Sequence, residues 1–169
     1  MSTSTLLTSL FKFKAWANEE LFALVRTVDP TQHANERHAC IRLLNHIYVV
    51  DRIFVAHLSG TTHGYTATNT VETPTLDALA IDVANTDQWL VGHVASLTSD
   101  ALVKPIDFVF TDASCARMSS EEMLMHVITH GGYHRGAVGR ILSHINLGPP
   151  RDLFTGFLHK TEPERRART

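Results

Sequence analysis

Apolar residues recur at steps of three and four along four long stretches of the chain, and this spacing constrains the fold more than any other feature. Such spacing gathers apolar side chains on one face of an α-helix. The pattern predicts helices over about residues 3–28, 36–58, 74–98 and 120–146. Helices of this length bury their apolar faces most economically against one another, so the sequence predicts an all-α protein built as a four-helix bundle.

Local signals mark where the predicted helices begin and end. Gly60 is a typical C-terminal stop for the second helix. Thr73 and Pro74 predict the N-cap and the first-turn proline of the third. Ser119 and Glu122 have the spacing of a capping box, which predicts the start of the last long helix.

Two connecting segments lack helical periodicity. The polar stretch TTHGYTATNTVET, residues 61–73, is predicted to be a loop that is long enough to cross the bundle. Between Pro105 and Met118 the residues alternate around Asp112, which favours a short hairpin or extended segment. The whole chain, residues 1–169, has the length of one ordinary domain, so we expect a single domain.

Composition excludes several classes of protein. The 15 basic and 17 acidic side chains give a net charge of −2, which offers no footprint for nucleic acid or an anionic membrane. Cys40 and Cys115, the only cysteines, cannot build a disulfide framework or a thiolate zinc cluster. No apolar run approaches the length of a membrane span and no targeting segment is recognisable. We therefore expect a soluble cytoplasmic protein.

Histidine is unusually frequent, at 11 of 169 residues. His126, His130 and His134 follow one another at four-residue steps in the last predicted helix, within an arc of about 80°. Two imidazoles on adjacent turns can bind one metal ion, whereas three on one straight helix would struggle to reach it. The spacing alone is weak, but His130 and His134 share their arc with Val127 and Val138, which must face the core.

A metal in the centre of a bundle usually takes ligands from more than one helix. His46 lies inside the apolar arc of the second predicted helix, whereas His57 lies about 16 Å further along it. A site of His46, His130 and His134 and a set of core histidines satisfied by hydrogen bonds are both compatible with this pattern, with His126 as a rival ligand or supporting neighbour. The remaining histidines are expected at the solvated surface: His33, His38, His63, His93, His144 and His159.

The segments LLNHIYVVDRIF and HGGYHRG, about eighty residues apart, together resemble the DinB family of damage-inducible four-helix-bundle proteins. FKFKAWANEEL near the start and GPPRDLFTGFL near the end extend the resemblance over nearly the whole chain. The resemblance implies a divalent metal ion, commonly zinc or nickel, held by one histidine of the second helix and an i,i+4 pair of the last. In this chain these are His46, His130 and His134.

The resemblance also implies a homodimer and a link to bacillithiol- and mycothiol-dependent transferases, in which a metal activates a low-molecular-weight thiol. We therefore expect a metal-dependent hydrolase or thiol S-transferase that acts on a small molecule. The alternative is a metal-binding or stress-related protein without turnover. The residues identify no catalytic acid or base, and the net charge argues against DNA binding.

The neighbours of the three histidines give further expectations. Asn45, Asp51 and Glu122 are the polar residues nearest in sequence that could orient the imidazoles, and Arg135 is expected on the flank of the bundle. Four glycines in the last helix each cost about 1 kcal/mol relative to alanine, which implies compensation. Close packing, as at a dimer face, is the interpretation for three of them, and that of Gly131 stays open. These three are Gly132, Gly136 and Gly139.

Overall fold

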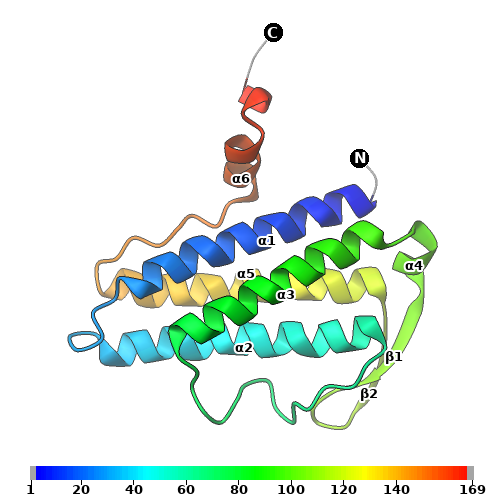
Figure 1. Cartoon of the computed structure of the whole chain (residues 1–169), viewed down its shortest axis with the longest axis horizontal. Helices are drawn as coiled ribbons and strands as arrows, with labels where there is room; N and C mark the ends of the chain where they lie inside the picture. Colours follow the sequence, from blue (N-terminus) through cyan, green and yellow to red (C-terminus); the bar gives the residue numbers. More distant parts are fainter. Residues whose placement is uncertain (1–2, 167–169) are drawn as a thin grey trace.

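The computed structural model describes residues 3–166, most of which are helical (Figure 1). The long helices are α1 (Thr3–Arg26), α2 (Ala34–Ser59), α3 (Leu76–Ser96) and α5 (Ser120–His144). The short elements are α4 (Ser99–Val103), β1 (Pro105–Val109), β2 (Cys115–Ser119), α6 (Phe154–Thr161) and the 3₁₀-helix η1 (Pro163–Arg166). The predicted all-α class is confirmed. None of the helices within residues 3–166 has the length and apolar character of a membrane span.

The four long helices form a bundle with a crossover connection. α1 packs chiefly against α3, and α2 chiefly against α5. α1 and α5 run in one direction and α2 and α3 in the other, so the link over residues 60–75 returns along the length of the bundle (Figure 1). The predicted crossover is therefore confirmed, and it lays a polar loop alongside α2.

Most of the predicted helix ends are confirmed. Gly60 closes α2 in the left-handed conformation, at φ 65°, which glycine adopts without a steric penalty. Ser119 and Glu122 form the capping box of α5. The predicted start of the third helix was wrong by two residues: Thr75 is the N-cap of α3, because its hydroxyl accepts a hydrogen bond from the Ala78 N–H.

The segment before α5 is a short antiparallel hairpin, as predicted. β1 pairs with β2 in a register that runs from Pro105 opposite Ser119 to Val109 opposite Cys115. The Asp112 carboxylate accepts hydrogen bonds from the N–H and the hydroxyl of Ser114 in the turn. Phe108, the buried residue of β1, packs against the end of the bundle.

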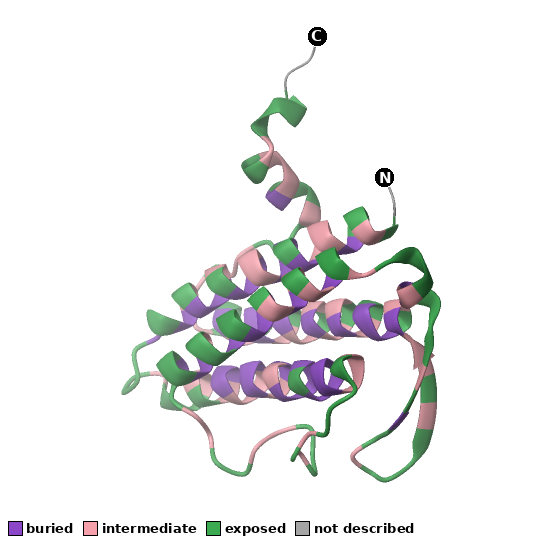
Figure 2. Ribbon diagram, turned by 45° about the vertical axis from the view of Figure 1, so that its right-hand side comes forward, coloured by how far each residue is buried: buried purple, intermediate pink, exposed green. Residues whose placement is uncertain are grey.

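Two apolar clusters fill the two halves of the bundle, and the buried residues lie on the inner faces of the helices (Figure 2). Val25, Leu142 and their neighbours occupy one half, and Phe11 and Met123 with theirs occupy the other. Between the two clusters lies a layer of buried polar side chains, contributed by all four long helices. The buried polar layer consists of Lys14, Asn18, Asp51, Asp87 and Arg135.

α6 lies outside the four-helix arrangement (Figure 1). Its Phe157 is buried against Phe13 and Trp16 of α1, with ring centroids 6.0 and 5.7 Å apart. Aromatic pairs at these separations stabilise a contact beyond the area that they bury. The segment after α5 is therefore attached to the outer face of α1.

Candidate metal centre

His46 of α2 and His130 and His134 of α5 lie together where these two helices pack. The ring centroids of His46 are 4.9 Å from those of His130 and 4.6 Å from those of His134, and the two α5 rings are 4.5 Å apart. Each residue offers one nitrogen, and the three nitrogens lie within 4.8 Å of one another. This three-histidine cluster could hold a metal ion, and the structure brings together all three residues that the sequence selected.

A carbonyl from the crossover loop fixes the orientation of His46. Its Nδ1 lies 2.7 Å from the carbonyl oxygen of Thr68. Because a carbonyl oxygen can only accept, the imidazole carries its proton on Nδ1 and keeps a lone pair on Nε2. That Nε2 lies 3.0 Å from Nε2 of His130. A histidine that donates through one nitrogen and presents the other is arranged as metal-binding histidines usually are.

Polar side chains of α2 hold the crossover loop in the position that this contact requires. The Asn45 amide donates to Thr70 Oγ1 at 2.7 Å and also to Asn69 Oδ1. The guanidinium of Arg42 donates to the Thr70 carbonyl at 2.7 Å. Asn45 was predicted to support the ligands, and it does so through the loop rather than by touching an imidazole.

The environment favours the neutral form of the two histidines of α5 in this cluster. Burial, followed by the nearby His134, His46, His126 and Lys14, lowers the pKa of His130 to about 3. Burial and His46 also lower the pKa of His134. Neutral imidazoles have the free lone pairs that a divalent transition metal ion requires.

One nitrogen of the cluster has no protein partner. His130 Nδ1 is buried and makes no hydrogen bond with any of residues 3–166. An unpartnered buried polar atom costs about 1–3 kcal/mol, so the hydrogen bonds of the chain do not fully satisfy this imidazole. The hydrogen bonds of the described residues therefore leave this imidazole partly unsatisfied, and the neutral nitrogen donors of His130 and His134 fit a divalent metal ion.

His126 lies outside the three-histidine cluster. Its ring stacks on that of His130 at 5.4 Å and 22°, and its other neighbour is Phe54 at 4.7 Å. The structure thus gives the fourth histidine a packing role, in which it covers one face of His130.

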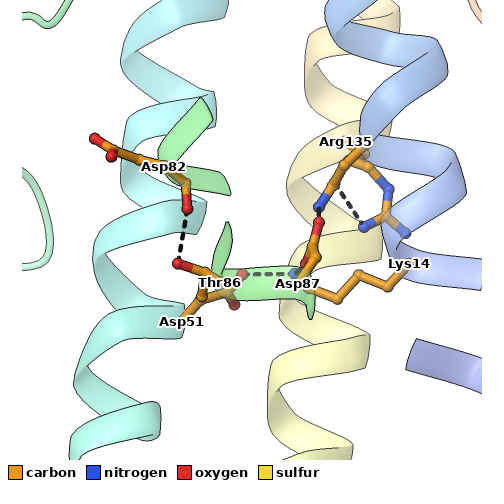
Figure 3. Close-up of polar contacts among 7 residues, drawn as sticks. Lys14, Asp51, Asp82, Thr86, Asp87 and Arg135 are labelled. Carbon is orange, nitrogen blue, oxygen red and sulfur yellow. Dashed lines mark hydrogen bonds and ion pairs between the residues drawn. The ribbon is translucent and has the colours of Figure 1, made fainter. Parts of the chain in front are cut away.

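Behind the three-histidine cluster, the buried polar layer links the helices. Lys14 Nζ of α1 lies 2.6 Å from Asp51 of α2 and 2.6 Å from Asp87 of α3 (Figure 3). Asn18 donates to the second oxygen of Asp87 at 2.7 Å. Asp51 was predicted as a partner of the imidazoles, but its carboxylate bonds to Lys14 instead.

The predicted position of Arg135 was wrong. Only 4% of its surface is exposed, and its guanidinium donates two hydrogen bonds to Asp152 and one to Asn18. The reason is that Asp152, in the segment after α5, supplies a paired acceptor for a buried guanidinium. Glu122 is likewise not beside the cluster, because it closes the capping box of α5.

The glycines of α5 have different explanations. A Cβ on Gly131 would lie 3.1 Å from the Arg135 guanidinium and 3.5 Å from Lys14 Cε, so this glycine makes room for the buried polar layer. A Cβ on Gly139 would meet Pro149 at 3.2 Å, so Gly139 packs closely against another segment of its own chain. Nothing lies within 4 Å of a Cβ on Gly136, so packing within the chain does not account for this position.

Sequence reasoning missed Lys14 and Thr68. Lys14 stands seven residues after Leu7 and seven before Leu21, so helical periodicity alone placed a lysine on the buried face. For Thr68 the sequence carries no comparable signal, because a loop has no period that tells which carbonyl faces a helix.

A helical bundle in which three imidazoles from two helices converge defines this chain as a candidate metal-binding bundle protein. The sequence matches the DinB family over residues 1–165. It is 20% identical over 176 residues to Protein DinB of Bacillus subtilis (strain 168), covering 92% of this chain and 95% of that protein. No solved structure gives a significant match. The chain belongs to the DinB family.

Proposed function

We propose that the protein is a metal-dependent enzyme, a hydrolase or a low-molecular-weight-thiol S-transferase, whose divalent ion is held by His46, His130 and His134. Zinc and nickel are among the ions that imidazole ligands suit. The observation that carries the proposal is the convergence of three imidazole rings, one of which is fixed by the Thr68 carbonyl with Nε2 directed inward. The DinB relationship supports the same reading.

Three protein ligands are typical of catalytic sites, because they leave room for water or substrate, whereas structural sites use four. When bound, a divalent ion lowers the pKa of a coordinated water or thiol and so supplies a nucleophile near neutral pH. In S-transfer, the thiol loses its proton, a carbon–sulfur bond forms, and the leaving group departs with its electron pair. The chain holds the donors in place through Thr68 and covers one face of His130 with His126.

The proposal includes a homodimer and a reducing compartment such as the cytoplasm. Tyr133, 77% exposed, and Gly136, with open space beside it, lie on the outer face of α5 and are suited to contact a second copy. Cys40 and Cys115 are both free thiols, which suits a reducing environment.

Metal analysis of four alanine variants tests the site. The purified protein is dialysed against metal-free buffer, and its retained zinc and nickel are measured beside His46→Ala, His130→Ala and His134→Ala. We expect about one tightly bound ion per wild-type chain and loss of that ion from each of these three variants. His144→Ala, which changes an exposed histidine of the same helix, is the matched control and should retain the ion. Unchanged metal in His130→Ala would refute the assignment.

A turnover assay then tests the catalytic part. Metal-loaded and chelator-stripped protein are compared for consumption of bacillithiol or mycothiol with an aryl halide, and for hydrolysis of an activated ester. A rate that requires the ion and disappears in His134→Ala is expected. Retained metal without any metal-dependent rate would favour the non-catalytic metal-binding protein instead.

A further inference from the structure

Two further histidines lie side by side at the C-terminal end of α2. His57 lies in the last turn of that helix, and His63 lies in the crossover loop just beyond it. Their ring centroids are 5.2 Å apart and their planes are nearly perpendicular, at 77°. His63 was expected at the solvated surface, but the loop turns back and lays its ring against the helix.

Each of these two rings has a buried nitrogen without a partner. His57 Nε2 and His63 Nδ1 form no hydrogen bond with any of the described residues. Leaving one such atom unsatisfied costs about 1–3 kcal/mol, and here two occur in adjacent rings that belong to different segments. A group that bonds to both nitrogens at once would remove both costs.

The surroundings of the pair favour a metal ion as that group. Burial, followed by the nearby His63, lowers the pKa of His57. Phe108 and Phe54 form an apolar wall, with ring centroids 4.8 and 6.0 Å from that of His57. The wall offers no hydrogen-bonding side chain, and the neutral imidazole keeps its lone pair free.

One ring of the pair, that of His63, borders a cavity at the surface. His63 lines a surface cavity of about 430 Å³, together with Arg52, Thr61 and Tyr65. The cavity has room for an ion to enter and for water or a small ligand to complete its coordination. A two-histidine site needs such additional ligands, since transition metals bind four or more donors.

We propose that His57 Nε2 and His63 Nδ1 form a second metal site, which binds a divalent transition metal ion such as zinc, copper or nickel. At metal–nitrogen distances of about 2.0–2.1 Å, two imidazoles at tetrahedral positions have centroids about 5.2 Å apart, close to the separation of this pair. Imidazole donors select these ions over magnesium or calcium.

The second site is distinct from the three-histidine cluster. His57 lies eleven residues beyond His46 on α2, which is about 16 Å along the helix. The rings of Phe54 and His126 lie between the two sites, since Phe54 contacts both His57 and His126. One ion cannot serve both groups, so the two sites can be filled and emptied separately.

Zinc binding at equilibrium tests the proposal. Chelator-stripped full-length protein is dialysed against micromolar free zinc, and bound zinc per chain is measured for the wild type and for His63→Ala, a loop variant that leaves α2 intact. We expect two ions per wild-type chain, and an affinity for one of them that falls by about tenfold or more in His63→Ala. His144→Ala serves as the matched control and should bind two.

The outcomes separate this proposal from the proposed function. In a His130→Ala background the ion at His57 and His63 should remain, and copper(II) bound there should show nitrogen hyperfine coupling that His57→Ala removes. A wild-type chain that saturates at one ion lost on His130→Ala would overturn the second site and leave the three-histidine site intact. A second ion that survives both His57→Ala and His63→Ala would also overturn it.

Discussion

Replacing Lys14 by methionine would show how much the buried polar layer contributes to stability. Lys14 has no exposed surface, and its Nζ is 2.6 Å from both Asp51 and Asp87. Methionine keeps an unbranched side chain of similar length and removes the ammonium group, so the main change is electrostatic. Asp87 retains Asn18 as a donor, whereas Asp51 Oδ1 is already without a partner.

The expected loss can be worked from these contacts. Removing one partner of a buried ion pair costs about 3–5 kcal/mol, because the remaining charge stays desolvated. The Asp51 carboxyl, whose pKa burial raises to about 6, can instead take up a proton, which costs only about 1 kcal/mol at pH 7. We therefore expect Lys14→Met to lower the free energy of unfolding by about 1–4 kcal/mol at pH 7.

The pH dependence of this loss identifies its cause. At pH 5 the folded Asp51 carboxyl, with its pKa of about 6, is mostly protonated even in the wild type, so the loss should shrink as the pH falls. A loss that came only from altered packing would be the same at both values. Adding Asp51→Asn to Lys14→Met should recover part of the stability, because it removes the carboxylate that has lost its partner.

Urea unfolding followed by far-ultraviolet circular dichroism, in buffer that contains a metal chelator, measures these quantities. The wild type, the two single variants of Lys14 and Asp51, and the double variant complete a thermodynamic cycle at pH 7 and pH 5. A loss below about 1 kcal/mol for Lys14→Met at pH 7, or an equal loss at both pH values, would refute the electrostatic reasoning.

Three further predictions concern Gly131, Asp51 and the unfolding of the whole chain. Gly131→Ala should be less stable than Gly136→Ala by about 1–3 kcal/mol in urea unfolding, because only the first new methyl meets the fixed guanidinium of Arg135. Burial raises the pKa of Asp51 from 3.8 to about 6, so between these pH values the folded state holds a proton that the unfolded state has lost. The free energy of unfolding therefore falls as the pH rises through 6, by up to about 3 kcal/mol, and Asp51→Asn should remove this fall. If the chain is a single domain, circular dichroism and tryptophan fluorescence should report one coincident unfolding transition.

The sequence predicted the bundle because its helices repeat one physical pattern over many residues. Each apolar face of α1, α2, α3 and α5 is built from many residues, so the prediction of a helix does not depend on any one of them. The start of α3 depends instead on one hydroxyl. Thr73 and Thr75 were both chemically able to cap that helix, and only the path of the crossover loop selects Thr75.

In the candidate site, too, residues on helix faces could be predicted from the sequence, whereas their distant partners could not. His46, His130 and His134 could be found because they occupy buried faces of two helices, where periodicity gives the direction of each side chain. Periodicity also put Lys14 on a buried face, but a lysine is rarely buried unless paired, and its partners stand 37 and 73 residues further along the chain.

Helical periodicity does not predict which loop residues contact a helix. The Thr68 carbonyl reaches α2 because Asn45 and Arg42 hold the neighbouring Thr70 against that helix. The His63 ring reaches it from the start of the loop, where the Thr61 N–H donates to the Ala56 carbonyl. Those contacts join residues with no fixed spacing, so a helical wheel assigns them no direction. The crossover loop thus orients His46 in the three-histidine cluster and also completes the pair of His57 and His63. A change that detaches the loop at Asn69 and Thr70, such as Asn45→Ala, should therefore weaken metal binding at the three-histidine cluster, whereas His63→Ala should affect only the second site.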